Sequence, residues 1–187
     1  MRVKFTALVL CVSLFLTGCK GANDCLDKAV SFRNKLLESN GCSFRSEITA
    51  DYGEKIYTFT MMCNADKAGN MTFEVEKPES ISGICGKITT QGGAITFDDQ
   101  ILAFQSLADG QITPVNAPWI LIKTLRSGYI RSCTEDEDGF EIAIDDSYEE
   151  NALRLIIELE NNIPDECEIF WKGRRILTVD IEAFTFM

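Results

Sequence analysis

The chain has 187 residues, of which 18 are basic and 29 acidic, and its formal net charge at pH 7 is −11. It contains no histidine, which excludes Ser-His-Asp and Cys-His catalytic groups as well as histidine metal sites. The negative charge disfavours binding to nucleic acid and to anionic lipid head groups. We therefore expect a protein that is not an enzyme, with no nucleic-acid partner, no cofactor and no metal.

An export signal opens the sequence. Two basic residues within the first four precede an apolar run over 5–16, and Leu-Thr-Gly-Cys follows at 16–19. The apolar run is shorter than the roughly 20 residues that a membrane-spanning helix requires. Residues 16–19 resemble the lipobox of bacterial lipoproteins, which implies removal of the signal peptide 1–18 and attachment of diacylglycerol and a further acyl chain to Cys19. The alternative is an ordinary secretory signal with a chance cysteine after the cut.

A short tether, residues 19–22, and a helix to about Ser39 are predicted next. Asn23 or Asp24 is placed to cap the helix, and Asn40-Gly41 to end it. Its apolar face is predicted to hold Leu26, Ala29, Val30, Leu36 and Leu37. Because the tether is short, the single domain over 23–187 is expected to lie close to the bilayer, outside the cytoplasm.

From Cys42 onward the apolar residues mostly alternate with polar ones, which is typical of β-strands separated by Gly, Asp and Asn turns. The predicted strands lie near 42–50, 55–63, 70–76, 81–89, 94–98, 101–106, 129–134, 139–145, 152–160, 165–172 and 175–186. A second helix is predicted from Ala117 to Ser127, where Pro118 begins it and Gly128 ends it. It is apolar almost all round, which is typical of a buried helix.

These elements predict a mainly β fold with about eleven antiparallel strands and two helices. A sheet of that length is expected to curve strongly into a half-open barrel. Its concave face must be filled by side chains, a helix or a ligand, and the second helix is the candidate plug.

Three segments carry a resemblance to a known family: Tyr57-Thr58-Phe59, the stretch 69–84, and the closing strand 175–184. They resemble the LolA-like lipoprotein carriers and their anchored relatives, including clostridial germination lipoproteins of the GerS type. The resemblance implies a half-open antiparallel β-barrel closed by helices, with an apolar cavity that accommodates acyl chains or packs against a partner. The carriers are soluble, whereas this chain has a lipobox, so it is more similar to an anchored receptor, lipid binder or scaffold.

Six cysteines remain after Cys19: Cys25, Cys42, Cys63, Cys85, Cys133 and Cys167. An even number in an exported domain favours disulfides. If the first hairpin turns so that Asp51 faces Glu54, Cys42 lies opposite Cys63 and the two form a candidate disulfide. The alternative is that all six are small buried thiols. Cys25, near the membrane end of the first helix, is a candidate free thiol.

Several aromatic side chains on the predicted elements supply bulky apolar surface, and most of them are expected to be core. Phe59, Phe97 and Trp119 are the candidates for lining a cavity open to an acyl chain.

The acidic run 135–139 could be a calcium loop, but it lacks the ligand spacing of an EF-hand and is better explained as a solvated turn. Arg126, Arg131, Arg174 and Arg175 could meet a phosphate or an acidic partner.

The leading hypothesis is a membrane-anchored envelope lipoprotein that binds a lipid or a lipidated protein in an apolar half-barrel. The alternative is an adaptor, whose cavity is filled by its own side chains and whose surface docks an envelope or spore-cortex enzyme. A wall-active hydrolase would need two carboxylates converging in a cleft, and it is the third hypothesis.

Overall fold

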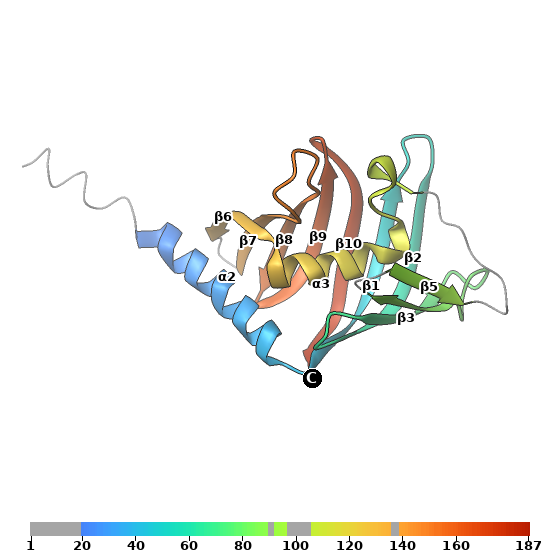
Figure 1. The fold of residues 1–187 in the computed structure, drawn as a ribbon, viewed down its shortest axis with the longest axis horizontal. Coiled ribbons are helices and arrows are strands. Elements are labelled where there is room, and N and C mark those ends of the chain that lie inside the picture. The colour runs from blue at the N-terminus through green and yellow to red at the C-terminus, as the bar shows by residue number, and fades with distance from the viewer. Residues whose placement is uncertain (1–19, 90–91, 97–105, 136–138) are drawn as a thin grey trace, which may run out of the picture.

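The computed structural model describes residues 20–89, 92–96, 106–135 and 139–187. Two helices, α2 (Lys20–Glu38) and α3 (Ala117–Ser127), pack against one antiparallel sheet (Figure 1). The strands are β1 (Gly41–Asp51), β2 (Ile56–Asp66), β3 (Met71–Lys77), β4 (Cys85–Thr89), β5 (Gly92–Thr96), β6 (Tyr129–Glu135), β7 (Gly139–Asp145), β8 (Arg154–Glu160), β9 (Ile163–Trp171) and β10 (Arg174–Phe186).

The described sheet has ten strands in the order β5-β4-β3-β2-β1-β10-β9-β8-β7-β6. Strands that lie side by side in the sheet are consecutive in sequence except at the centre, where β1 and β10, the first and last strands, pair and place Ile48 opposite Val179. The sheet is open, since β5 and β6 each pair on one side only within the described strands. We predicted about eleven strands; the eleventh segment, 101–106, falls almost entirely outside the described residues.

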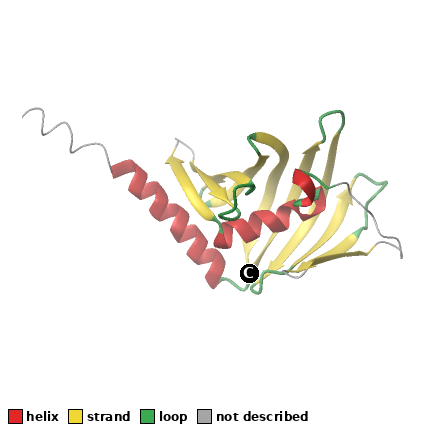
Figure 2. Cartoon of the chain, turned by 45° about the horizontal axis from the view of Figure 1, so that its top comes forward, coloured by secondary structure: helices red, strands yellow, loops and turns green. Residues whose placement is uncertain are grey.

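Alternation within the strands gives the sheet two faces. The inner face carries buried apolar side chains such as Ile48, Ile157 and Val179, and α3 lies across it (Figure 2). The outer face carries the intervening polar residues, among them Glu47 and Asp180. This period of two is what a sheet with one solvated face requires.

Helix α3 occupies the bounds that the sequence predicts, and it covers the inner face as expected. Seven of its eleven residues are buried, and Leu121 is fully enclosed. Pro118 lies in the first turn of α3. Backbone N–H groups there have no acceptor within the helix, so the absence of an N–H in proline breaks no helical hydrogen bond. Within the described residues, neither helix combines the length and apolar character needed to cross a membrane.

Helix α2 lies beside the edge strand β6, and a disulfide joins them. Cys25 of α2 and Cys133 of β6 have Cα atoms 5.7 Å apart and are separated by 108 residues in sequence. The expectation of a free thiol at Cys25 was therefore wrong, because the helix brings it against a strand that is remote in sequence. A helix pinned to an edge strand also shields that edge from pairing with another chain.

The start of α2 differs from the prediction. Residues 20–22, expected to form a tether, are helical, and the helix runs on through Asn23 and Asp24. Lys20 and Ala22 both favour helix, so the first turn forms without a capping residue at position 23 or 24. The helix consequently begins at the residue that directly follows Cys19 in the sequence.

Candidate functional site

A groove on the solvent side of α3 is the candidate site, and we call it the α3 groove. It is formed where α3 meets the C-terminal turn of α2 and the turn between β2 and β3, and its volume is about 380 Å³. That volume lies within the range of about 300–1,000 Å³ found for small-molecule sites. The lining residues are Leu37, Ala68, Gly69, Trp119, Ile122, Lys123, Arg126 and Ser127.

Trp119 forms the wall between α3 and the β2–β3 turn. Its indole Nε1 donates a hydrogen bond to the carbonyl oxygen of Gly69 at 2.9 Å. A tryptophan whose single donor is satisfied can present its ring as a rigid apolar surface. Leu37 adds exposed aliphatic surface beside the ring, and Ile122, which is 2% exposed, closes the groove from the core side, so most of the wall is apolar.

Two arginines hold the groove together. Arg126 donates to the carbonyl oxygens of Asp66 (3.1 Å) and Lys67 (2.5 Å), which ties α3 to the β2–β3 turn. Arg33 of α2 donates to the carbonyl oxygens of Leu125 (2.7 Å) and Gly128 (2.9 Å). Leu125 lies in the last turn of α3 and Gly128 directly follows the helix, where carbonyl groups lack helical partners. The three walls are thus cross-linked by charge-assisted hydrogen bonds.

A cation stands at the mouth of the groove. Lys123 is exposed, and its ammonium lies 5.5 Å from the centre of the Trp119 ring. Helix α3 itself contains no acidic residue. An apolar wall with an ammonium at its rim is suited to an amphiphile that carries an anionic group on an alkyl chain.

Comparison with known proteins shows likeness at the level of solved structures alone. The chain is similar to a LolA superfamily protein from Nitrosomonas europaea, with 10% sequence identity, a TM-score of 0.45, and coverage of 85% of this chain and 93% of that chain. It is also similar to a putative outer membrane lipoprotein-sorting protein domain from Vibrio parahaemolyticus, with 7% identity, a TM-score of 0.39, and coverage of 88% and 93%.

The third likeness is to MucB of the Pseudomonas aeruginosa MucA/MucB complex, with 8% identity and a TM-score of 0.38. It covers 84% of this chain and 56% of that chain. No family model and no curated protein matches this chain. At these identities and TM-scores the likeness carries no argument about a ligand or a partner, so the site is judged on its own geometry.

The structure separates the three candidate cavity residues. Trp119 lines the α3 groove. Phe59 is buried, faces Ile48 across β1 and β2, and belongs to the core. Phe97 lies outside the described residues. The groove itself was missed, although Trp119, Ile122, Lys123 and Arg126 share one face of a helix at spacings of three, four and seven residues.

The candidate disulfide between Cys42 and Cys63 was wrong. Cys42 faces Ala65 and Cys63 faces Phe44, so the register differs by two residues from the one we predicted. Both thiols are free and buried, and burial raises the pKa of each to about 12. They therefore act as small apolar core residues.

The arginines considered for an external anion are occupied within the protein. Arg126 donates to the carbonyl oxygens of Asp66 and Lys67, and Arg131 donates to Asp145, which also accepts from Arg154. Arg174 pairs with Asp51, and Arg175 pairs with Glu168. Of the acidic run 135–139, Glu135 ends β6 and Gly139 begins β7, and residues 136–138 lie outside the described residues. The described residues hold no group of three or more side chains placed to bind a metal ion.

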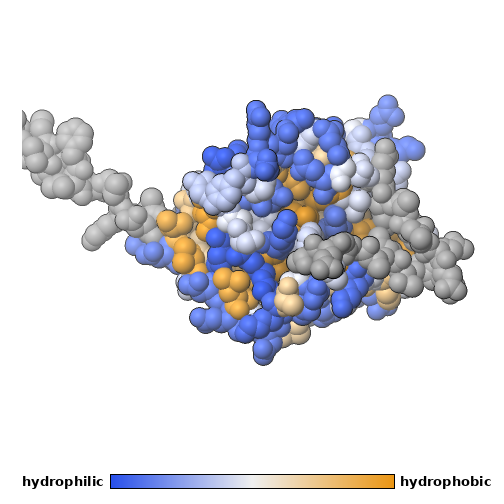
Figure 3. Space-filling view, viewed as in Figure 1, coloured by the Kyte–Doolittle hydropathy of each residue, from blue (hydrophilic) through white to orange (hydrophobic). Residues whose placement is uncertain are grey.

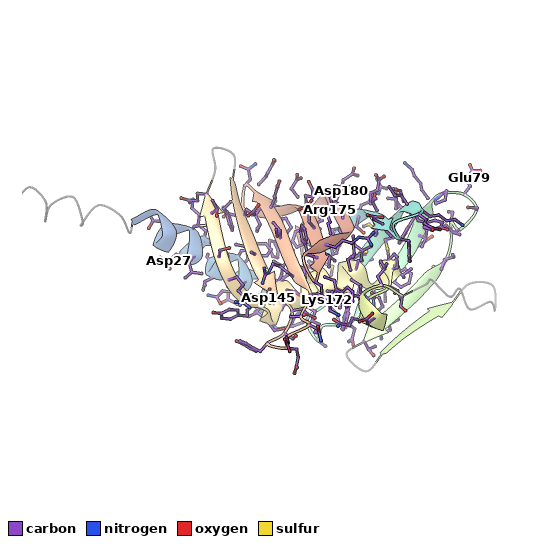
Figure 4. All side chains as sticks on the ribbon, turned by 90° about the horizontal axis from the view of Figure 1, so that it is seen from above. Asp27, Glu79, Asp145, Lys172, Arg175 and Asp180 are labelled. Atoms are coloured by element: carbon purple, nitrogen blue, oxygen red, sulfur yellow. A yellow bond between two sulfur atoms is a disulfide. The ribbon has the colours of Figure 1, made fainter. Side chains whose placement is uncertain are left out.

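A row of carboxylates crosses the outer face. Directly opposed residues on five adjacent strands are Glu47, Asp180, Glu166, Glu158 and Glu141; Asp180 is labelled in Figure 4. Burial, then the charge of Glu47, raises the pKa of Asp180. Burial, then the charges of Asp180 and Glu158, raises the pKa of Glu166. Like charges opposed across strands disfavour the sheet.

We predict that Asp180→Asn stabilises the protein at neutral pH by about 0.5–1 kcal/mol. The folded-state pKa of Asp180 lies above the unfolded value, so its ionisation costs stability as the pH rises through the folded pKa. The gain should therefore vanish when the pH falls below the ordinary aspartate value of 3.8. Urea unfolding at several pH values tests this, with the exposed loop variant Glu150→Gln as control. A gain that persists in acid would contradict the repulsion account.

Proposed function

We propose that this chain is a lipid-anchored, non-enzymatic binding protein of the cell envelope, and that it takes an acyl chain of a lipid or a lipidated protein into the α3 groove. The observation that carries the proposal is the combination of Trp119, Leu37 and Ile122 as an apolar wall with the Lys123 ammonium at the mouth. Although the chain as a whole is strongly acidic, this groove is apolar and has a lysine at its mouth, so it favours an anionic amphiphile.

The mechanism is desolvation of the alkyl chain followed by charge pairing. Apolar surface removed from water contributes about 25 cal/mol per Å². The hydrogen bond from Trp119 to Gly69 already fixes the indole ring, so ligand binding costs little side-chain entropy. Lys123 then pairs with a carboxylate or phosphate at the groove mouth.

The proposed lipid anchor would hold the protein on the membrane. The lipobox-like sequence ends at Cys19, and α2 begins at Lys20. Attachment of two or three acyl chains at Cys19 would hold the protein on the membrane, whereas one chain binds only marginally. The groove would accordingly work beside the outer surface of the membrane and would not shuttle between membranes.

Titration with dansyl-labelled undecanoic acid tests the groove. The wild-type protein should bind the probe, and Trp119→Glu should weaken the affinity by about 10- to 100-fold, equivalent to about 1.4–2.8 kcal/mol. Trp171→Phe is the matched aromatic control outside the groove and should bind as the wild type does. Equal affinity of Trp119→Glu and wild type would refute the assignment of the groove.

The adaptor hypothesis is the second candidate, and the filling of the inner face favours it. Ile120, Leu121 and Leu125 of α3 are each at most 4% exposed against the sheet, so the described interior is packed by the protein's own side chains. Under this hypothesis the wild-type protein fails to bind the acyl probe, and an envelope enzyme binds the protein surface. The same titration therefore separates the two candidates.

A further inference from the structure

A second apolar line runs along α2, apart from its buried face. Leu26, Val30 and Leu37 are 43%, 41% and 40% exposed, and their spacings of four and seven residues place them on one side of the helix. The face that packs into the core is made of other residues: Cys25, Ala29, Phe32 and Leu36. Helix α2 thus has one apolar face packed in the core and a second apolar line that is exposed at the surface.

This line is continuous with the α3 groove. Leu37, its last member, lines the groove together with Trp119 and Ile122. Hydrophobic residues are visible along α2 and where it approaches α3 (Figure 3). We call the combined surface of Leu26, Val30, Leu37 and the groove the α2–α3 face.

Charge is segregated between the α2–α3 face and the outer face. Lys123 and Arg126 border the groove, and Lys67 in the adjoining turn is exposed. The carboxylate row, by contrast, lies on the outer face of the sheet, on the side away from α3. The surroundings of the groove thus carry three cations, against which the same turn sets the exposed carboxylate of Asp66, so they are less acidic than the outer face with its carboxylate row.

We propose that the α2–α3 face lies on an anionic lipid bilayer, with α2 parallel to the surface. The inference rests on the proposed lipid anchor, because α2 starts directly after Cys19 and its first turn would be at the membrane. Nineteen helical residues extend for about 28 Å, so the α3 groove at the far end of α2 also meets the bilayer. The acyl chain that enters the groove would then come from this bilayer.

The electrostatics favour a bilayer in this orientation over the opposite one. Apolar residues of an interfacial helix enter the head-group region by about 5–10 Å, and neighbouring cations pair with anionic lipids. The orientation also places the carboxylate row on the side remote from the negative surface, which lowers the repulsion that the net charge would otherwise cause.

The two tryptophans report on the orientation. Trp119 lines the α3 groove, beside the β2–β3 turn. Trp171 ends β9, next to the hairpin that pairs Arg174 with Asp51 at the other end of the strands. Strand β2 joins these two ends, and its eleven residues extend for about 33 Å.

The experiment uses the mature lipoprotein in vesicles of phosphatidylglycerol and phosphatidylcholine with acyl-brominated lipid as quencher. In the Trp171→Phe protein, the Trp119 emission should fall by about half, since the groove lies within the 5–10 Å depth of an interfacial helix. In the Trp119→Phe protein, the Trp171 emission should be unchanged. Leu26→Ser with Val30→Ser should reduce the quenching of Trp119, whereas the control pair Ile56→Ser with Tyr57→Ser should leave it unaltered.

The proposed orientation is overturned if the two tryptophans are quenched equally. It is also overturned if the quenching of Trp119 is the same in the Leu26→Ser, Val30→Ser variant as in the protein without these changes. Failure here is distinguishable from failure of the proposed function, because Leu26 and Val30 do not line the groove. Retained binding of dansyl-undecanoic acid without quenching by the bilayer overturns the orientation alone. Quenching without binding of the probe overturns the groove function alone.

Discussion

Replacing both Cys25 and Cys133 with serine is expected to lower the free energy of unfolding by about 4 kcal/mol. The bond closes a chain segment of 108 residues, and cross-links that close long loops remove the most entropy from the unfolded chain. The loss should exceed that of any surface substitution, because such changes usually fall within about 0.5 kcal/mol. Urea unfolding of the oxidised protein and the double variant measures it.

Cys85 provides the control for this prediction. It is an exposed free thiol on β4, so Cys85→Ser should leave the free energy of unfolding unchanged. A double variant of Cys25 and Cys133 that is as stable as Cys85→Ser would show that the bond between α2 and β6 does not form in the native protein.

Leu121→Ala is expected to lower the free energy of unfolding by about 3 kcal/mol. Leu121 is fully buried between α3 and the inner face, so truncation removes apolar contact and leaves a cavity in the centre of the core. The measurement is chemical denaturation, in which the midpoint should fall while the slope stays constant.

Lys123→Ala is the matched control on the same helix. Lys123 is exposed at the groove mouth, so this variant should retain the stability of the wild type. If Leu121→Ala were equally neutral, α3 would not be packed against the sheet and the inner face would have to be filled in another way.

Most of the secondary structure was predictable because the sequence pattern and the burial pattern agree. The period of two in Leu155, Ile157 and Leu159, with Arg154, Glu158 and Glu160 among the intervening residues, predicted β8, although the acidic residues before it would suit a helix. Pro118 and Gly128 correctly predicted where α3 begins and ends. Local patterns of this kind require no knowledge of distant contacts.

The register of the first hairpin was not predictable from the same pattern. We placed Asp51 opposite Glu54, but it faces Ile56, and Tyr52 donates its N–H to the Lys55 carbonyl oxygen across a longer loop. A shift of two residues leaves every side chain on its original face. The alternation therefore fits both registers, and only the turn geometry decides between them.

The disulfide and the groove escaped prediction for a different reason. Cys25 and Cys133 are 108 residues apart, and the groove joins Leu37, Gly69 and Trp119 from three distant segments. Only the packing of α2 and α3 against the sheet brings these residues together. Trp119 was identified in advance because a large aromatic side chain on an apolar helix stands out locally.

Photo-crosslinking with a diazirine-bearing fatty acid, followed by peptide mapping, tests the central claim most directly. If the α3 groove binds the acyl chain, the label should appear in the β2–β3 turn and in α3, and Trp119→Glu should remove it. Label confined to the inner strands such as β8, or label that survives Trp119→Glu, would contradict binding in the groove.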